Sequence, residues 1–331
     1  MIPVAVLGAT GTVGQRFIQL LDGHPSFQVV AGAAGPGRVG TRYGDTTWRL
    51  HGEMPVAARD LVCQAPEDVQ GVRVAFSALP GGIAGPIEST LAARGIVVCT
   101  NARDHRMDDD VPLLIPEVNP EALDAVAGKD GFILANGNCS GIILTLALAP
   151  LHRAFGIEHA DVTTMQAISG AGHPGVPSMD ILGNVVPFIG GEEDKLESEP
   201  LKTLDADFPI RATCTRVPVQ DGHFESVHLR LGRAATHDEI ISAFGDFSGP
   251  ADIAALPSAP ERPIHVATRH DRPQPLLDRD AERGMSVTVG RIRLDADGRG
   301  LRFVVLGHNT LRGAAGQSVL NAEFAVARGL I

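Results

Sequence analysis

The sequence has few cysteines, fewer basic than acidic residues, and no long hydrophobic run. Its formal net charge of −11 disfavours a nucleic-acid partner, because phosphate binding requires clustered basic residues. Glycine or a charged residue interrupts every apolar run before it reaches the roughly 18 residues that a membrane span needs. The N-terminal residues lack the basic segment of a secretory signal. We therefore expect a cytoplasmic protein that binds neither nucleic acid nor a membrane.

The four cysteines are widely separated, at Cys63, Cys99, Cys139 and Cys214. They form no CxxC pair and show no His/Cys spacing typical of a metal site. The simplest interpretation is four reduced thiols and no bound metal.

The length of 331 residues and a hydrophobic content of 44% are sufficient for two domains, each with its own core. In the first half, short β-rich runs alternate with segments of helical period, which predicts a parallel sheet with crossover helices. The expected strands are 4–7, 27–31, 72–77, 96–100 and 132–135, with helices around 13–21 and 87–93.

The second half begins with a long apolar helix from Ser140 and continues with strand-like runs at 217–219, 227–231, 285–292 and 303–306. This pattern predicts a mixed or antiparallel sheet. Residues 248–263 indicate a loop or short helix, and 317–329 a final helix.

A glycine-rich turn lies between the first predicted strand and helix. Gly8, Gly11 and Gly14, in GATGTVG, are where a backbone must approach a pyrophosphate, although a simple tight turn is the alternative. No acidic residue follows the second strand between Ala31 and Arg42, which favours NADP over NAD. Arg38 and Arg42 could meet the 2′-phosphate, or they could be ordinary solvated arginines.

Cys139 lies in NGNCSG, immediately before the apolar helix. Free N–H groups and the helix dipole at such a position lower a thiol pKa, which favours a nucleophilic cysteine. A buried, inert cysteine is the alternative, and this spacing alone does not decide between them.

Blocks along nearly the whole chain resemble aspartate-semialdehyde dehydrogenases, specifically the branch typical of archaea and fungi. The blocks are GATGTVGQRF, SALPGGIAGPIE, NARDHRMDDDVPLLIPEVN, NGNCS, TMQAISGAGHPGVPSMDILGNVVPFIGGEEDK, RVPVQDGHFESV, GMSVTVGRIR and HNTLRGAAGQSVLNAE. The resemblance implies an α/β fold similar to glyceraldehyde-3-phosphate dehydrogenase. A Rossmann-type NADP-binding domain would span 1–138 and be completed by a C-terminal helix within 307–331. An α+β catalytic and dimerisation domain with a mixed or antiparallel sheet would span 139–306.

The resemblance also implies an activity, the NADPH-dependent reductive dephosphorylation of L-aspartyl 4-phosphate to L-aspartate 4-semialdehyde through a cysteine thioester. Such a reaction belongs to amino-acid biosynthesis leading to lysine, threonine and methionine. By this resemblance Cys139 is the nucleophile, His223 the general acid/base, and Gln166 the residue that orients the acyl group.

Five further residues are implied to bind the substrate. Arg216 would bind its carboxylate, Glu199 its ammonium, and Arg106 and Lys202 its phosphate, with Asn138 contacting the substrate or its phosphate. Glu199 and Lys202 match an E-x-x-K pair, for which a surface ion pair is the alternative. The expected cofactor contacts are Gly8, Thr10, Gly11, Thr12, Val13, Gly14, Arg38, Ser77, Ala78, Ser169, Gly170 and Asn309.

The resemblance implies a homodimer or homotetramer, and the poorly charged stretch 180–190 supports an assembly. Three features depart from the family pattern: Gly141 where threonine is usual, the GPGR cofactor loop, and Pro200 within the E-x-x-K block. We expect no catalytic role for His173 or for His228, since His228 would face the opposite side of its strand from His223.

Two other kinds of function remain open. One is a reductase of an acyl-coenzyme A, such as malonyl- or succinyl-CoA, or of N-acetylglutamyl phosphate, but neither substrate class would pair the carboxylate of Glu199. The other is a catalytically idle NADP-binding regulatory protein, which the joint presence of Cys139, Gln166 and His223 disfavours.

Overall fold

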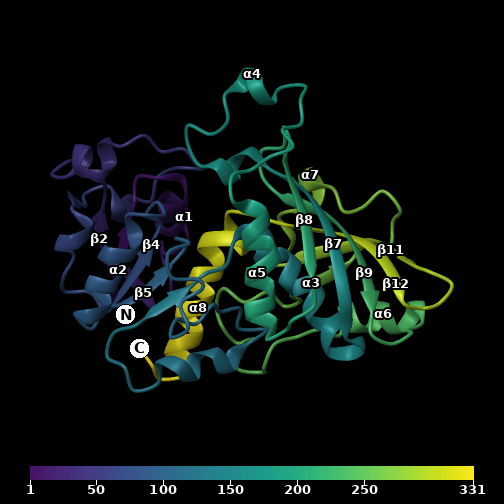
Figure 1. Cartoon of the computed structure of the whole chain (residues 1–331). Coiled ribbons are helices and arrows are strands. Elements are labelled where there is room, and N and C mark those ends of the chain that lie inside the picture. Colours follow the sequence, from purple (N-terminus) through teal and green to yellow (C-terminus); the bar gives the residue numbers. More distant parts are fainter.

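The computed structural model describes all 331 residues, which form two six-stranded sheets and the helices that cover them (Figure 1). The first sheet has the order β3-β2-β1-β4-β5-β6, and all its neighbouring strands are parallel. Its strands are β1 (Ile2–Leu7), β2 (Phe27–Ala33), β3 (Cys63–Gln64), β4 (Val74–Ser77), β5 (Val97–Thr100) and β6 (Ile133–Ala135). Helix α1 (Thr12–Leu20) follows β1, and α2 (Ala84–Ala93) follows β4. This order, which reverses between β1 and β4, confirms the predicted Rossmann-type sheet.

The second sheet has the order β10-β11-β12-β9-β7-β8 and is mixed, as predicted. The β7–β8 and β10–β11 pairs are parallel and the other pairs antiparallel. Its strands are β7 (Ile157–Gln166), β8 (Ile210–Arg216), β9 (His223–Leu231), β10 (Ile264–Val266), β11 (Val287–Leu294) and β12 (Gly300–Gly307). The helices of this half are α3 (Cys139–Phe155), α4 (Ser178–Ile181), α5 (Glu192–Leu204), α6 (His237–Gly245) and α7 (Pro275–Asp278), and α8 (Gly316–Ala327) ends the chain.

One predicted strand is wrong. Residues 217–219 are not in a sheet but follow β8 as an irregular segment, and Pro218 within it has no N–H to donate to a ladder. The loop expected at 248–263 is confirmed. The terminal helix expected at 317–329 is also confirmed, because α8 covers most of that range.

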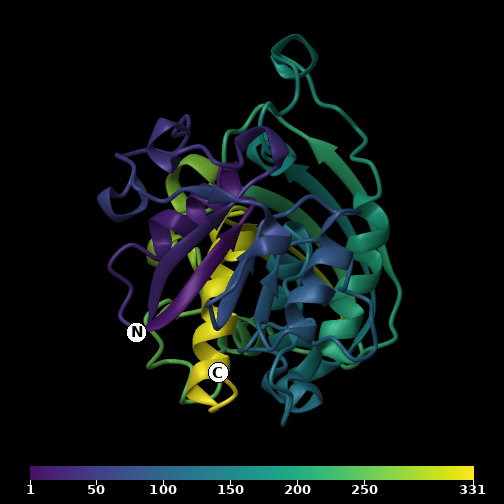
Figure 2. The same cartoon turned by 90° about the vertical axis from the view of Figure 1, so that its left-hand side faces the viewer.

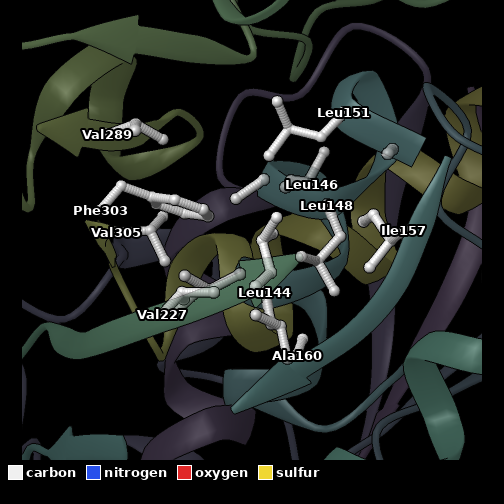
Figure 3. Close-up of a cluster of buried hydrophobic side chains, with 14 of the residues drawn as sticks. Leu144, Leu146, Leu148, Leu151, Ile157, Ala160, Val227, Val289, Phe303 and Val305 are labelled. Atoms are coloured by element: carbon white, nitrogen blue, oxygen red, sulfur yellow. The ribbon is translucent and has the colours of Figure 1, made fainter. Parts of the chain in front are cut away.

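Helix α3 forms the centre of the second core (Figure 3). All residues from Ser140 to Leu151 are buried, so this helix is apolar on every side. Leu144 and Leu148 pack in one cluster with residues of all six strands of the second sheet, including Val227, Phe303 and Val305. This packing fixes the position of the helix, and therefore of Cys139 at its first residue.

Helices α3, α5 and α6 pack on one face of the second sheet, and only the short helix α7 touches the other face, at the end of β12. In β9 the residues from His223 to Leu231 alternate between buried and more exposed positions, with Val227 buried and His228 exposed. His228 thus faces away from His223, as predicted. An antiparallel sheet tolerates one uncovered face, but that face is also available to a partner.

Helix α8 returns to the first sheet. Its residues Val319, Leu320 and Phe324 belong to the same core cluster as Val4 and Phe76, and Figure 2 shows the helix alongside the strands of that sheet. We therefore propose the division expected from the sequence, with 1–138 and 307–331 as one domain and 139–306 as the other. None of the helices combines the length and the apolar composition that crossing a membrane requires.

Candidate active site

A cavity of about 730 Å³ lies at the carboxyl ends of the first-sheet strands. Its walls come from the loops after β4, β5, β6 and β7, from the start of α5, and from residues 309–314. In doubly wound folds, ligands bind at this edge of the sheet. Cys139 lies in the wall of the cavity and is partly exposed there.

Cys139 is the first residue of α3, which begins one residue before the predicted start at Ser140. The side-chain oxygen of Asn138 caps the helix by accepting the main-chain N–H groups of Ser140 and Gly141, at 3.0 and 3.1 Å. Gly313 packs directly against the cysteine, since a Cβ atom added to Gly313 would lie 2.8 Å from the Cβ of Cys139. The nucleophile is thus held between its own helix and a π-helical turn at Leu311–Ala315.

His223 begins β9 and reaches the thiol. Its Nε2 lies 3.1 Å from Sγ of Cys139, and its Nδ1 accepts the main-chain N–H of Ala167 at 3.1 Å. A nitrogen that accepts a hydrogen bond carries no proton, so the neutral ring has its proton on Nε2, directed at the sulfur. Burial, and then the charge of Arg216, lower the pKa of His223 to about 3, which keeps the ring neutral.

The pKa of the Cys139 thiol does not follow the sequence-based expectation. Burial, and then the charge of Glu192, raise it to about 12, although Arg216 and Arg106 act in the opposite direction. The prediction of a lowered thiol pKa is therefore wrong for the free site. Desolvation by the surrounding protein outweighs the helix N-terminus.

Gln166, the last residue of β7, is held in one orientation. Its side-chain oxygen accepts the hydroxyl of Thr164 at 3.0 Å, and its Nε2 donates to Oε1 of Glu192 at 3.0 Å. The same Nε2 is 3.5 Å from Nε2 of His223, so Gln166, His223 and Cys139 lie together as predicted.

Glu192 is the only carboxylate that lines the cavity. It begins α5, accepts the Asn138 amide at 2.8 Å through Oε1, and accepts Nζ of Lys195 at 3.0 Å through Oε2. Burial would raise the pKa of Glu192, but Lys195 and the amides of Asn138 and Gln166 lower it overall. The site therefore contains an ionised carboxylate close to the thiol.

Arg216 ends β8 and is also buried in the wall. Its Nη1 donates to the carbonyl of Ala167 at 2.7 Å, and no carboxylate lies within 4 Å of it. A Cβ atom on Gly170 would lie 2.9 Å from Nη1 of Arg216 and 3.0 Å from Cε1 of His223. A larger residue at position 170 would therefore displace Arg216 or His223, so the site needs glycine there.

Glu199 and Lys202 do not line the cavity, which argues against the predicted contacts with substrate. Glu199 accepts Nη1 of Arg106 at 2.8 Å and the main-chain N–H of Asn138. Lys202 donates to the carbonyls of Arg106, Asp108 and Val111. Arg106 does line the cavity, but Glu199 compensates its charge.

Glu192 and Lys195, which were not predicted as site residues, form an earlier E-x-x-K pair on the same helix. The motif occurs twice, seven residues apart, and seven residues are nearly two helical turns. Both pairs therefore lie on the same side of α5, but only the first lies at the cavity. This repeated spacing was the sequence feature from which the Glu192–Lys195 pair could have been predicted.

The glycine loop after β1 has the shape of a phosphate cradle. Gly8 has φ of +72°, and a Cβ atom on Gly14 would lie 2.1 Å from the carbonyl oxygen of Gly8, so helix and loop approach closely. The main-chain N–H groups of Thr12, Val13 and Gly14 have no protein acceptor. These free donors at a helix N-terminus fit a pyrophosphate.

The other expected cofactor residues are divided between the cavity wall and its surroundings. Val13, Ala78, Ser169, Gly170 and Asn309 line the cavity, and the Asn309 amide donates to Oγ of Ser169 at 2.8 Å. The loop next to the cavity and the first turn of α1 contain Gly8, Thr10, Gly11, Thr12 and Gly14. Ser77 is buried at the end of β4 and does not line the cavity.

The two arginines after β2 differ in their partners. Arg42 forms an ion pair with Asp60, which compensates its charge. Arg38 lies exposed in a 3-10 turn, Pro36–Arg38, with no carboxylate within 4 Å. Arg38 is thus the better candidate for a 2′-phosphate.

Comparison with known proteins gives a consistent assignment. The description "Semialdehyde dehydrogenase, NAD binding domain" matches residues 3–126, and "Semialdehyde dehydrogenase, dimerisation domain" matches 148–312. A relative named aspartate-semialdehyde dehydrogenase from Methanothermobacter thermautotrophicus is 49% identical over 98% of both chains. The chain belongs to the aspartate-semialdehyde dehydrogenase family.

Further members of this family show the same likeness. The aspartate-semialdehyde dehydrogenase of Saccharomyces cerevisiae is 41% identical over 98% of both chains. The crystal structure of the Candida albicans aspartate-semialdehyde dehydrogenase with NADP covers 100% of both chains, with a TM-score of 0.91 and 40% identity. Aspartate-semialdehyde dehydrogenase II from Vibrio cholerae, complexed with ASA, covers 98% of both chains with a TM-score of 0.81 and 27% identity. These findings confirm the predicted family and favour it over the two alternatives.

Proposed function

We propose that this member of the aspartate-semialdehyde dehydrogenase family catalyses the NADPH-dependent conversion of L-aspartyl 4-phosphate to L-aspartate 4-semialdehyde. The observation that supports this most directly is the contact of 3.1 Å between Sγ of Cys139 and Nε2 of His223, at the wall of a cavity rich in cationic side chains. A cysteine nucleophile, a hydrogen-bond donor and binding groups for an anionic substrate are the parts that acyl transfer requires.

The charged groups of the cavity suit this substrate. Arg216 has no carboxylate partner and would bind the substrate carboxylate, while Glu192 would receive the ammonium group. Arg106 and Lys195 would face the phosphate, and Asn138 and Gln166 would hold Glu192 in place. Glu192 and Lys195 thus take the roles that the sequence suggested for Glu199 and Lys202.

The covalent steps consume one proton overall, and His223 does not have to supply it. Sγ of Cys139 attacks the β-acyl carbon as the C–O bond to phosphate breaks and a thioester forms; the proton of the thiol leaves on the departing phosphate, and solvent returns a proton to the sulfur after the last step. Bound NADPH supplies a hydride to the acyl carbon of that thioester. The oxyanion that results collapses to the aldehyde and returns the electron pair to Sγ. Throughout, Nε2–H of His223 stabilises the charge on sulfur and oxygen as a donor.

This role differs from the general acid/base that the family resemblance implied. Protonating Nδ1 would direct two N–H groups at each other, because Ala167 already donates to that nitrogen. The imidazolium form is therefore disfavoured in this geometry. We propose that His223 acts as a fixed hydrogen-bond donor.

The residues present fit NADP as the cofactor. The free N–H groups of Thr12, Val13 and Gly14 would hold the pyrophosphate, and Arg38 the 2′-phosphate. Asn309, Ser169 and Gly170 lie at the junction with the thiol and would border the nicotinamide end. No carboxylate follows β2 to bind a ribose 2′-hydroxyl, which favours NADP over NAD.

A homodimer or homotetramer is part of this proposal. Four apolar side chains between residues 179 and 188 are strongly exposed: Met179, Leu182, Val185 and Phe188. They belong to the arm that carries α4, which projects from the body of the molecule in Figure 1. The arm and the uncovered face of the second sheet would be buried against a second copy.

We also propose a cytoplasmic location and a role in the synthesis of lysine, threonine and methionine. All four cysteines are free thiols, which suits a reducing compartment. The biosynthetic role rests on the family to which the chain belongs.

The decisive assay measures phosphate-dependent reduction of NADP⁺ with L-aspartate 4-semialdehyde, and the same reaction with NAD⁺. We expect activity that requires phosphate, that prefers NADP⁺ and that Cys139→Ala abolishes while NADPH still binds. Phosphate-independent activity that requires coenzyme A would favour the acyl-coenzyme A reductase instead. Absence of any turnover by a folded, NADPH-binding protein would favour the regulatory alternative.

A further inference from the structure

The wall of the active-site cavity carries an excess of positive charge. Four cationic side chains line it, against the single carboxylate of Glu192: Arg103, Arg106, Lys195 and Arg216. The chain as a whole is acidic, with a net charge of −11. A local excess of the opposite sign in a cavity points to an anionic ligand.

Two of these cations already have carboxylate partners. Arg106 pairs with Glu199 at 2.8 Å, and Lys195 pairs with Glu192 at 3.0 Å. Arg216 has none, and the proposed function assigns it to the substrate carboxylate. Arg103 is the remaining uncompensated cation, with no carboxylate within 4 Å and no hydrogen-bond acceptor on the protein.

The loop that carries Arg103 lies between the glycine loop and the nucleophile. It follows β5, whose neighbours are β4, next to the glycine-loop strand, and β6, which leads to Cys139. The side chain extends over Gly81 in the loop after β4, where an added Cβ would lie 3.2 Å from Cγ and 3.3 Å from Nε of Arg103. The exposed guanidinium therefore lines the cavity between the glycine loop and Cys139.

The adjacent acidic residue, Asp104, forms no ion pair with Arg103, although its Oδ2 lies beside that side chain: a Cβ added to Gly81 would lie 3.2 Å from this oxygen and 3.3 Å from Nε of Arg103. Oδ1 of Asp104 accepts the main-chain N–H groups of Gly82 and Gly85, at 2.8 and 3.4 Å, at the start of α2. Asp104 thus accepts hydrogen bonds at the N-terminus of that helix and is not paired with Arg103.

We propose that Arg103 is an additional phosphate-binding residue of this cavity. The inference rests on the proposed function, which brings phosphate groups to the cavity from two sources. One is the phosphate that leaves the acyl carbon, or its inorganic equivalent, and the other is the phosphates of the dinucleotide. A guanidinium suits either, because its planar fork donates two parallel hydrogen bonds to a phosphate.

The experiment compares the full-length variants Arg103→Gln and Arg103→Lys with the control Arg94→Gln. Arg94 is an exposed arginine at the other end of α2, where it donates to the carbonyl of Glu67. Three quantities are measured: the KM for inorganic phosphate, the phosphate concentration that half-protects Cys139 from iodoacetamide, and the Kd of NADPH by fluorescence titration. The second and third require no turnover.

We expect Arg103→Gln to raise at least one of these quantities about tenfold, the loss typical of one charge-assisted contact, and Arg103→Lys to restore part of it. A rise in the two phosphate quantities identifies the substrate phosphate, and a rise in the Kd of NADPH identifies the dinucleotide. Values within threefold of Arg94→Gln in all three measurements overturn the proposal. A wild-type protein without phosphate-dependent turnover would refute the proposed function, while protection and NADPH binding would still decide the role of Arg103.

Discussion

The main-chain N–H of Ala167 donates to Nδ1 of His223, and this bond of 3.1 Å fixes which nitrogen faces Cys139 with a proton. The ring is a neutral donor to a thiol whose pKa is raised to about 12, and its own pKa is lowered to about 3. The free site therefore contains a thiol and a neutral imidazole rather than a thiolate–imidazolium pair. Its reactivity should depend on pH accordingly.

The first prediction concerns alkylation of Cys139 by iodoacetamide in the free enzyme. Because the thiol pKa lies well above the assay range, the thiolate fraction and the rate should rise about tenfold per pH unit between pH 6 and 9, without a plateau. His223→Asn should lower the rate but leave the shape of the profile unchanged, since His223 does not titrate there. Cys139→Ser is the control for labelling of other thiols, which are buried. A plateau reached by pH 7 would show that a low-pKa ion pair exists.

The second prediction separates the two E-x-x-K glutamates. Glu192→Gln should reduce kcat/KM for aspartate semialdehyde by roughly 10- to 150-fold, or about 1.5 to 3 kcal/mol, because it removes the charge that faces the ammonium. It should slow succinic semialdehyde, which has no ammonium, much less. Glu199→Gln leaves Arg106 buried without its partner, so it should destabilise the fold by about 3 to 5 kcal/mol and slow both compounds by a similar factor. If Glu199→Gln reduced the preference for aspartate semialdehyde over succinic semialdehyde more than Glu192→Gln does, Glu199 and not Glu192 would bind the ammonium.

The third prediction concerns the contact between Gly313 and Cys139. A methyl group on Gly313 would lie 2.8 Å from Cβ and 3.0 Å from Cα of the cysteine, so either the π-helical turn or the start of α3 must shift. Since a displacement of about 1 Å at a nucleophile can cost on the order of 100-fold in rate, we expect Gly313→Ala to lower kcat at least tenfold. NADPH binding should remain close to that of wild type. Gly245→Ala is the matched control, because nothing lies within 4 Å of its added Cβ. A kcat for Gly313→Ala within threefold of this control would contradict the prediction.

The features predicted correctly from the sequence are those encoded by neighbouring residues. The glycine loop, the start of α3 at Cys139 and the alternation of β9 each depend on a short stretch of chain. Strands β7 and β8 were not predicted, because their residues show no clear alternation of hydrophobic and polar side chains. One face of their sheet is uncovered, and residues such as Ala212 and Cys214 give the covered side little hydrophobic contrast.

The details of the site depend on contacts between distant parts of the chain. Burial raises the pKa of the Cys139 thiol, and one residue that packs against it, Gly313, lies more than 170 positions away in the chain. Which E-x-x-K pair meets the substrate depends on which end of α5 reaches the cavity. The tautomer of His223 depends on the N–H of Ala167, which follows β7. No local pattern contains this information.

The last prediction concerns Glu225, a buried carboxyl group that the proposed reaction does not use. It lies two residues after His223 on the same face of β9, and neither of its oxygens has a hydrogen-bond partner. Burial, and then the charge of Glu192, raise the pKa of Glu225 well above its ordinary value. Burial therefore favours the protonated form of Glu225 in the folded protein, and burying the group costs more at a pH where the unfolded chain would ionise it.

The pH dependence of stability follows from this shift. A carboxyl group whose folded-state pKa is raised contributes its full stability below the unfolded pKa and loses it as pH rises towards the folded pKa. Glu225→Gln retains the shape but has no proton to lose, so its stability relative to wild type should increase between pH 4.5 and pH 8. Urea unfolding at the two pH values measures this difference, and we expect the variant to gain on the order of 1 kcal/mol or more across that range. Glu121→Gln, in an exposed turn, is the control and should show no such gain. An equal effect of Glu225→Gln at both pH values would mean that Glu225 is ionised in the native protein.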